Sequence, residues 1–164
     1  MNLKELYVPK YEIFVDMDGV IADFDKQFKE FSGQNSKEYE QENGTKAFWK
    51  LIDKIGVKYW SEMSWMPEGK ELWNYVAPYN PKLLSAPSRS NNSRLGKKEW
   101  VEKHLPGVQL ILAERPNKQN YSGRDKILID DNKQTITEWK ANSGIGLHFI
   151  STTQTIEELK KLGL

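Results

Sequence analysis

Two short apolar runs, each ending in a pair of acidic residues, constrain this chain more than any other feature. Residues 13–15 (IFV) lead into Asp16 and Asp18, and residues 127–129 (ILI) lead into Asp130 and Asp131. A continuous apolar run of this kind favours a buried strand, and the glycine after Asp18 lets the chain turn away sharply. Neighbouring carboxylates repel one another, so two such pairs predict a shared Mg²⁺ site with oxygen ligands.

Strand-like and helix-like segments alternate along most of the chain. Strands are expected at residues 12–16, 82–85, 108–113, 127–130 and 145–150. Helices are expected at 97–104, 133–142 and 155–162, with Asn132 and Thr155 as caps. Alternation of short apolar strands with helices predicts an α/β fold with a doubly wound parallel sheet.

Residues 24–81 interrupt this alternation. The interval lacks a clear strand and holds most of the tryptophans, and phenylalanines recur in it at helical spacing. We therefore expect a small helical cap inserted after the first strand, with residues 1–23 and 82–164 forming the catalytic core. Residues 88–94 are expected to form a solvated loop.

Composition narrows the classes of protein that remain. The 164 residues suit one domain, and 24 basic against 23 acidic residues give a net charge of +1, which argues against a nucleic-acid or membrane partner. The absence of cysteine excludes disulfides and thiolate metal sites. No apolar run reaches the length of a membrane span, and residues 1–10 lack the apolar core of a signal peptide, so a cytoplasmic protein is expected.

In an open α/β sheet, ligands bind beyond the carboxyl ends of the strands. Asp16 and Asp18 follow the first expected strand, Ser85 ends the second, and Asp130 and Asp131 end the fourth. If these three strands are neighbours, the five residues converge on one pocket.

These motifs resemble those of the haloacid dehalogenase superfamily of phosphotransferases. The superfamily pattern is Asp-x-Asp-Gly after strand one, Ser or Thr after strand two, a later Lys, and an acidic pair after strand four. The chain is more similar still to the 5'(3')-deoxyribonucleotidases, through DMDGVIADF at 16–24, Ser-Ala-Pro at 85–87, WVEKHL at 100–105 and ILIDD at 127–131. The aromatic pair at 48–49 resembles one in the cap of those enzymes.

The resemblance implies a Mg²⁺-dependent phosphatase. Asp16 would attack phosphorus and form an aspartyl-phosphate, Asp18 would act as acid and base, and Ser85 would hydrogen-bond a phosphoryl oxygen. Mg²⁺ would be held by Asp16, the backbone carbonyl of Asp18, and Asp130. Asp131 would act through water or by orienting the lysine.

The catalytic lysine has three candidates. The resemblance favours Lys118, after a small insertion relative to the nucleotidases. Lys126 lies inside the fourth strand run, and Lys97 occupies the position used in other branches of the superfamily.

Substrate contacts are expected from two stretches. Phe24, Phe48 and Trp49 are candidates for holding a base or sugar, although packing within the cap is an alternative role for them. Ala86 and Arg89 are candidates in the stretch after the second strand, where Arg89 or Arg94 could contact phosphate or substrate.

The favoured substrate is a deoxyribonucleoside monophosphate. Phosphatase action on nucleic-acid 3'-phosphate ends or on sugar phosphates is an alternative. A phospho-accepting receiver domain is a further alternative, but no aspartate ends the third expected strand, where a receiver accepts phosphate. Exposed aromatic residues on the cap could support a homodimer.

Overall fold

The computed structural model describes residues 10–164. The expectation about a signal peptide therefore falls almost entirely outside the described residues. Within residues 10–164, five strands occur, at β1 Glu12–Val15, β2 Lys82–Ser85, β3 Leu110–Leu112, β4 Lys126–Asp130 and β5 Ile145–His148. All five expected strands are confirmed, although the third and the fifth are shorter than predicted. Among the described residues, no helix is both long enough and apolar enough to cross a lipid bilayer.

The five strands form one parallel sheet in the order β3-β2-β1-β4-β5. The predicted neighbours are confirmed, because β1 lies between β2 and β4. Val15 is in register with Leu83 of β2 and with Ile129 of β4, so the carboxyl ends of these strands lie along one edge. This register places the polar residues that end the strands side by side.

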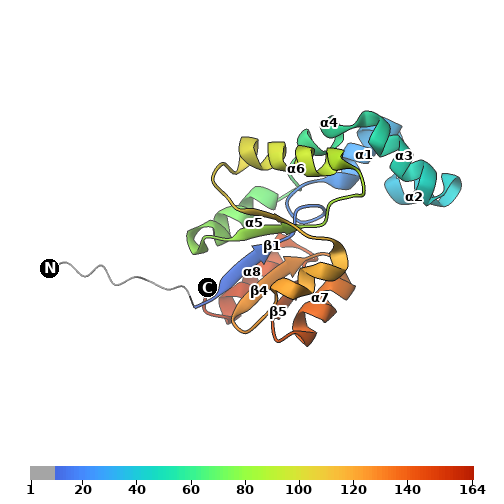
Figure 1. The fold of residues 1–164 in the computed structure, drawn as a ribbon. Coiled ribbons are helices and arrows are strands. Elements are labelled where there is room, and N and C mark those ends of the chain that lie inside the picture. The colour runs from blue at the N-terminus through green and yellow to red at the C-terminus, as the bar shows by residue number, and fades with distance from the viewer. Residues whose placement is uncertain (1–9) are drawn as a thin grey trace.

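Helices cover both faces of the sheet (Figure 1). Before β2 come α5 Gly69–Val76 and the 3₁₀ segment η1 Ala77–Tyr79. The later strands β2 to β5 are followed in turn by α6 Asn91–His104, the 3₁₀ segment η2 Arg115–Tyr121, α7 Lys133–Ala141 and α8 Thr152–Lys161. Alternate residues of β1 point to opposite faces. Ile13 and Val15 join the large core with side chains of α5, α6 and α8, whereas Phe14 packs with Ile136 and Trp139 of α7. The doubly wound α/β fold is thus confirmed.

Four further helices gather beyond the sheet, on the side of β1's carboxyl end (Figure 1). They are α1 Phe24–Ser32, α2 Ser36–Asn43, α3 Thr45–Ile55 and α4 Val57–Ser61. In contrast, α5 lies beside the sheet and contacts α8, and Tyr75 of α5 donates a hydrogen bond to the carbonyl of Leu164. The extent of a separate cap therefore stays a prediction, and α1–α4 are its most distinct part.

Helix α6 packs against both this helical group and the core. Gly96 of α6 lies so close to α4 that a β-carbon there would overlap Trp60 and the carbonyl of Val57. Helix α6 continues along the core side, where Trp100 is fully buried and donates a hydrogen bond to the carbonyl of Met63. Close helix packing of this kind requires a residue without a side chain.

Two local predictions were wrong. Residues 88–94 are not a loop throughout, because α6 begins at Asn91 and the Ser90 side chain caps it by accepting a hydrogen bond from Asn92 N. Helix α8 is capped by Ser151 rather than Thr155, since the Ser151 hydroxyl accepts from Gln154 N. The cap at Asn132 is confirmed by its bond from Thr135 N.

Candidate active site

The carboxyl edge of the sheet brings together the acidic residues expected there. Asp16 directly follows β1, and Asp130 is the last residue of β4. One carboxylate oxygen from each of Asp16, Asp130 and Asp131 lies within 4.8 Å of the others. Asp16 and Asp130 are buried, while Asp131 is exposed at the rim. The sheet therefore gathers three acids that are up to 115 positions apart in the sequence.

Lys118 neutralises part of this charge. It lies on η2, and its ammonium group donates to Asp16 Oδ1 at 3.0 Å and to Asp130 Oδ2 at 2.7 Å. Burial disfavours its charged form, but the two carboxylates outweigh this effect and raise the pKa of Lys118. Its buried ammonium group thus remains charged.

Burial is also the main cause that raises the pKa of Asp16, and the negative charge of Asp130 adds to it. Lys118 acts in the opposite direction and favours the Asp16 carboxylate. Although the residue as a whole is exposed, the Asp131 carboxylate lies against the cluster, where its partial desolvation and the charges of Asp16 and Asp130 raise its pKa as well. A cation bound among these carboxylates would favour their charged forms and so lower the pKa values of Asp16 and Asp131.

The three-acid cluster fits Mg²⁺. Three carboxylates and one lysine leave a formal charge of −2, which one divalent cation balances. All the donors are hard oxygen atoms, the type that Mg²⁺ prefers. His148 helps to fix the rim of the cluster, because its Nε2 lies 2.9 Å from the backbone carbonyl oxygen of Asp131.

A second buried lysine serves a different set of groups. Lys97 of α6 is completely buried, and its ammonium group lies 2.5 Å from Asp18 Oδ2 and 2.8 Å from the hydroxyl of Ser85. The carboxylate of Asp18 therefore joins Lys97 and Ser85, rather than the three-acid cluster. Because Lys97 has only hydrogens to donate, Ser85 accepts from it and keeps its own hydrogen for another partner.

Asp18 has the features of an acid. Burial raises its pKa, against the opposing charge of Lys97, while 28% of its side-chain surface stays exposed. Its second oxygen, Oδ1, is buried without a hydrogen-bond partner among residues 10–164. An unpaired buried oxygen is costly for a charged carboxylate and less so for a protonated one.

The candidate lysines occupy three different places. Lys118 and Lys97 lie in the site, each with its own aspartate. Lys126 begins β4, at the opposite end of the strand from Asp130, and lies 3.9 Å from Glu12 near the far edge of the sheet. Of the three candidates, only Lys126 is placed away from the acids.

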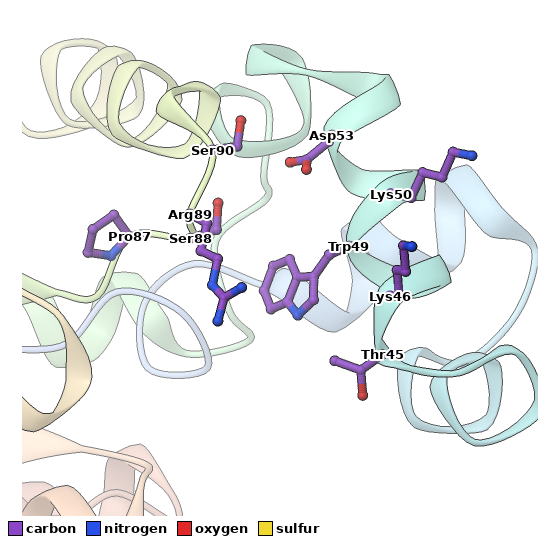
Figure 2. Close-up of a pocket in the computed structure, with 9 residues that line it drawn as sticks. All are labelled: Thr45, Lys46, Trp49, Lys50, Asp53, Pro87, Ser88, Arg89 and Ser90. Atoms are coloured by element: carbon purple, nitrogen blue, oxygen red, sulfur yellow. The ribbon is translucent and has the colours of Figure 1, made fainter.

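A cavity of about 780 Å³ adjoins the site between α3 and the loop before α6 (Figure 2). One wall is the α3 face made by Thr45, Lys46, Trp49, Lys50 and Asp53, and the other is Pro87–Ser90. Figure 2 shows the Trp49 indole and the Arg89 guanidinium extending into this space. The lining does not include the three acids, but Pro87 follows Ser85 by two residues, at most about 7 Å along the chain.

The expected substrate-contacting residues separate into two groups. Trp49 and Arg89 line the cavity, and Ala86 is half-buried in the loop that leads to it. Phe48 is buried on the other face of α3 and stacks on Phe28 with ring centroids 4.7 Å apart. Phe24 packs among the aromatic rings of the helical group, including those of Phe48 and Tyr59.

The polar residues on one face of α3 were not predicted as part of the site, although Trp49 beside them was. Lys46, Trp49, Lys50 and Asp53 recur at steps of three and four residues, opposite the buried face that holds Phe48 and Ile52. This spacing was visible in the sequence as one helical stripe. No pattern near His148 in the sequence indicates its contact with Asp131, and none near Lys97 indicates its contact with Ser85.

Comparison with solved structures identifies the fold. The chain resembles a hydrolase from Streptococcus pneumoniae TIGR4, with a TM-score of 0.60, 13% identity, and coverage of 93% of this chain and 100% of that one. A hydrolase from Pseudomonas syringae gives a TM-score of 0.50 at 15% identity, covering 92% and 89%. A dehalogenase with an intermediate complex gives 0.50 at 11% identity, covering 85% and 84%.

At these identities the likeness establishes the fold alone, which is the Rossmann-like α/β fold of these solved structures. Neither a protein-family model nor a curated protein sequence matches the chain.

Proposed function

We propose that this protein is a Mg²⁺-dependent phosphomonoester hydrolase that forms an aspartyl-phosphate on Asp16. The observation that carries the proposal is the division of the site between two lysines. Lys118 holds Asp16 beside Asp130, and Lys97 holds Asp18 beside Ser85. The two aspartates are thus given different surroundings, as a nucleophile and a general acid require.

In the first half-reaction, a carboxylate oxygen of Asp16 attacks phosphorus and the bond to the ester oxygen breaks. Asp18 gives its proton to the departing oxygen, so the alcohol leaves neutral. Ser85 donates its hydroxyl hydrogen to a phosphoryl oxygen, and Lys118 balances the charge on the transferring group. The raised pKa of Asp18 supports its role as the acid in this step.

In the second half-reaction, Asp18 takes a proton from water. The water oxygen attacks phosphorus, the bond to Asp16 breaks, and inorganic phosphate is released. Asp16, Asp130 and Asp131, with the backbone carbonyl of Asp18, would hold Mg²⁺. When bound, the ion would neutralise negative charge on the phosphoryl group.

The favoured substrate is a deoxyribonucleoside monophosphate, as for a 5'(3')-deoxyribonucleotidase. The cavity supports this choice because it is close to Ser85 and carries the exposed indole of Trp49, a flat surface on which a base can stack. Arg89 lines the same cavity and could contact the substrate phosphate or the base.

A phosphate-release screen tests the proposal. The purified protein with Mg²⁺ is offered deoxyribonucleoside monophosphates, sugar phosphates and 3'-phosphorylated oligonucleotides, with EDTA-treated protein and Asp16→Asn as controls. We expect release from the deoxynucleotides, loss of activity with EDTA, and no turnover by Asp16→Asn. Release that continues unchanged in Asp16→Asn would refute the assignment of the nucleophile.

A further inference from the structure

The cavity beside Ser85 carries more positive charge than a nucleotide base needs. Lys46 and Lys50 of α3 and Arg89 of the opposite wall are all exposed at its border. Within the described part of the chain, Asp53 is the one acidic side chain that lines it. Among residues 10–164, none of the three basic side chains forms an ion pair. The lining therefore has a formal excess of two positive charges.

These charges are arranged on both sides of Trp49. Figure 2 shows the Arg89 guanidinium facing the indole from the loop, and Lys46 one turn before Trp49 on α3. Lys50 lies along the outer rim, with its ammonium group directed away from the indole. A planar group stacked on Trp49 would thus meet the Arg89 guanidinium, with the exposed side chains of Lys46 and Lys50 on the rim of the opposite wall.

The cavity is also distinct from the place where phosphoryl transfer would occur. Lys118 and a bound Mg²⁺ would together neutralise the three acids, and Lys97 is already paired with Asp18. Neither set needs the cations of the cavity. A substrate that places its reacting phosphate at Asp16 and its base on Trp49, within reach of Arg89, would leave Lys46 and Lys50 without a partner.

We propose that this cavity binds a second phosphate, so that the preferred substrate is a nucleotide with an additional phosphate on its sugar. The inference rests on the proposed phosphatase function and narrows its substrate class. Exposed cations favour anions by modest amounts each, and a second phosphate can contact more than one of them. Because the cations are exposed, the preference should weaken as salt is added.

Titration calorimetry with the Asp16→Asn protein in Mg²⁺ tests the inference, since this variant is not expected to turn the ligand over. The probes are thymidine 5'-monophosphate, thymidine 3',5'-bisphosphate and the 5'-phosphorylated dinucleotide pTpT. We expect the bisphosphate to bind about tenfold more tightly than the monophosphate at low salt. If pTpT also binds more tightly than the monophosphate, the second phosphate belongs to the end of a nucleic-acid strand. If only the bisphosphate binds more tightly, the second phosphate belongs to a free nucleotide.

Matched double variants locate the effect. Lys46→Gln with Lys50→Gln removes two charges at the cavity, and Lys54→Gln with Arg94→Gln removes two exposed charges that do not line it. The first pair should reduce the ratio of the two affinities to about twofold. The second pair should leave the ratio unchanged.

The contrary results are equally definite. Equal affinity for the two thymidine nucleotides, no binding of either, or an equal change in the ratio for both double variants would overturn the inference. The phosphatase proposal fails on a different result, because it requires that wild-type protein release phosphate from at least one monoester.

Discussion

A β-carbon at Gly19 would overlap Oδ2 of Asp131, so the loop after β1 approaches this carboxylate more closely than any side chain permits. The backbone of Gly19 also has a φ of +80°, a region that other residues adopt only at a cost. The absence of a side chain at Gly19 thus leaves room for the Asp131 carboxylate beside the first acidic motif. The glycine of the DMDG motif serves the assembly of the acid cluster as well as the turn.

We expect Gly19→Ala to weaken Mg²⁺ binding. The new methyl group must displace Asp131, so the Mg²⁺ concentration for half-maximal activity should rise about tenfold. The left-handed backbone should also cost about 1–2 kcal/mol of unfolding free energy. Activity measured over a Mg²⁺ titration, together with urea denaturation, separates the two effects.

Gly107→Ala is the matched control. Gly107 has a φ of +84° and open space around it, so alanine brings the same backbone cost without a clash. Its stability should fall as in Gly19→Ala, while its Mg²⁺ dependence stays that of the wild type. A similar Mg²⁺ shift in both variants would show that backbone strain, rather than contact with Asp131, is responsible.

Lys118→Met should destabilise the protein strongly. The lysine is almost fully buried between Asp16 and Asp130, and its removal leaves two buried carboxylates without their cation. We expect a loss of about 3–5 kcal/mol in the free energy of unfolding, measured by urea denaturation without Mg²⁺. Added Mg²⁺ should restore part of the loss, since it binds the folded state and neutralises the same groups.

Lys126→Met removes the same charge from a half-exposed pair with Glu12 on the far side of the sheet. This change should cost about 0–1 kcal/mol and should not respond to Mg²⁺. If both lysine variants lost equal stability, the central place of Lys118 in the acid cluster would be refuted.

Much of the fold follows from local sequence patterns. The apolar run of β4 is buried on both faces of the sheet, as its continuous hydrophobicity predicts, and Asn132 caps the next helix as its type predicts. The convergence of Asp16 and Asp130 follows from the rule that parallel strands end at one edge. These features depend on neighbours in sequence or on topology, both of which a sequence can reveal.

Other features depend on packing between distant segments. Lys97 is buried because α6 passes Trp60 at Gly96 and then turns its next residue toward Ser85, and nothing near Lys97 in the sequence indicates this. A run of polar residues at 88–94 favours a loop, yet α6 begins at Asn91 because the Ser90 hydroxyl caps the helix. Phe48 and Trp49 are adjacent in sequence, and the packing of α3 determines which of them is buried.

Truncation of Trp49 should affect mainly KM, whereas truncation of the adjacent Phe48 should affect mainly stability. Trp49→Ala should raise KM for deoxynucleotides about five- to hundredfold, because a stacked base loses its platform, while KM for p-nitrophenyl phosphate changes little. Its effect on stability should be small, since 37% of the residue is exposed. Steady-state kinetics with both substrates measures the difference.

Phe48→Ala should instead cost about 3–5 kcal/mol of stability, because it leaves a cavity in the core of the helical group. At a temperature where this variant remains folded, its KM for deoxynucleotides should be close to the wild-type value. A large rise in this KM with Phe48→Ala, and none with Trp49→Ala, would show that the base does not stack on Trp49.

The pH dependence of turnover should reveal the acid. Asp18 must be protonated to give a proton to the leaving alcohol, and burial raises its pKa, so this form persists to higher pH than for an ordinary aspartate. The rate of deoxynucleotide hydrolysis should therefore fall as pH rises through this raised pKa. Asp18→Asn should lower kcat about 10²–10⁴-fold and abolish that descending limb.

The leaving group supplies the control for this assignment. p-Nitrophenolate departs without a proton, so the first half-reaction with p-nitrophenyl phosphate should not need the protonated Asp18. Single-turnover release of nitrophenolate should then stay level across the pH range in which deoxynucleotide cleavage declines. If both substrates declined together, the titrating group would govern the site as a whole, and the proton for the alcohol would have to come from a group other than Asp18.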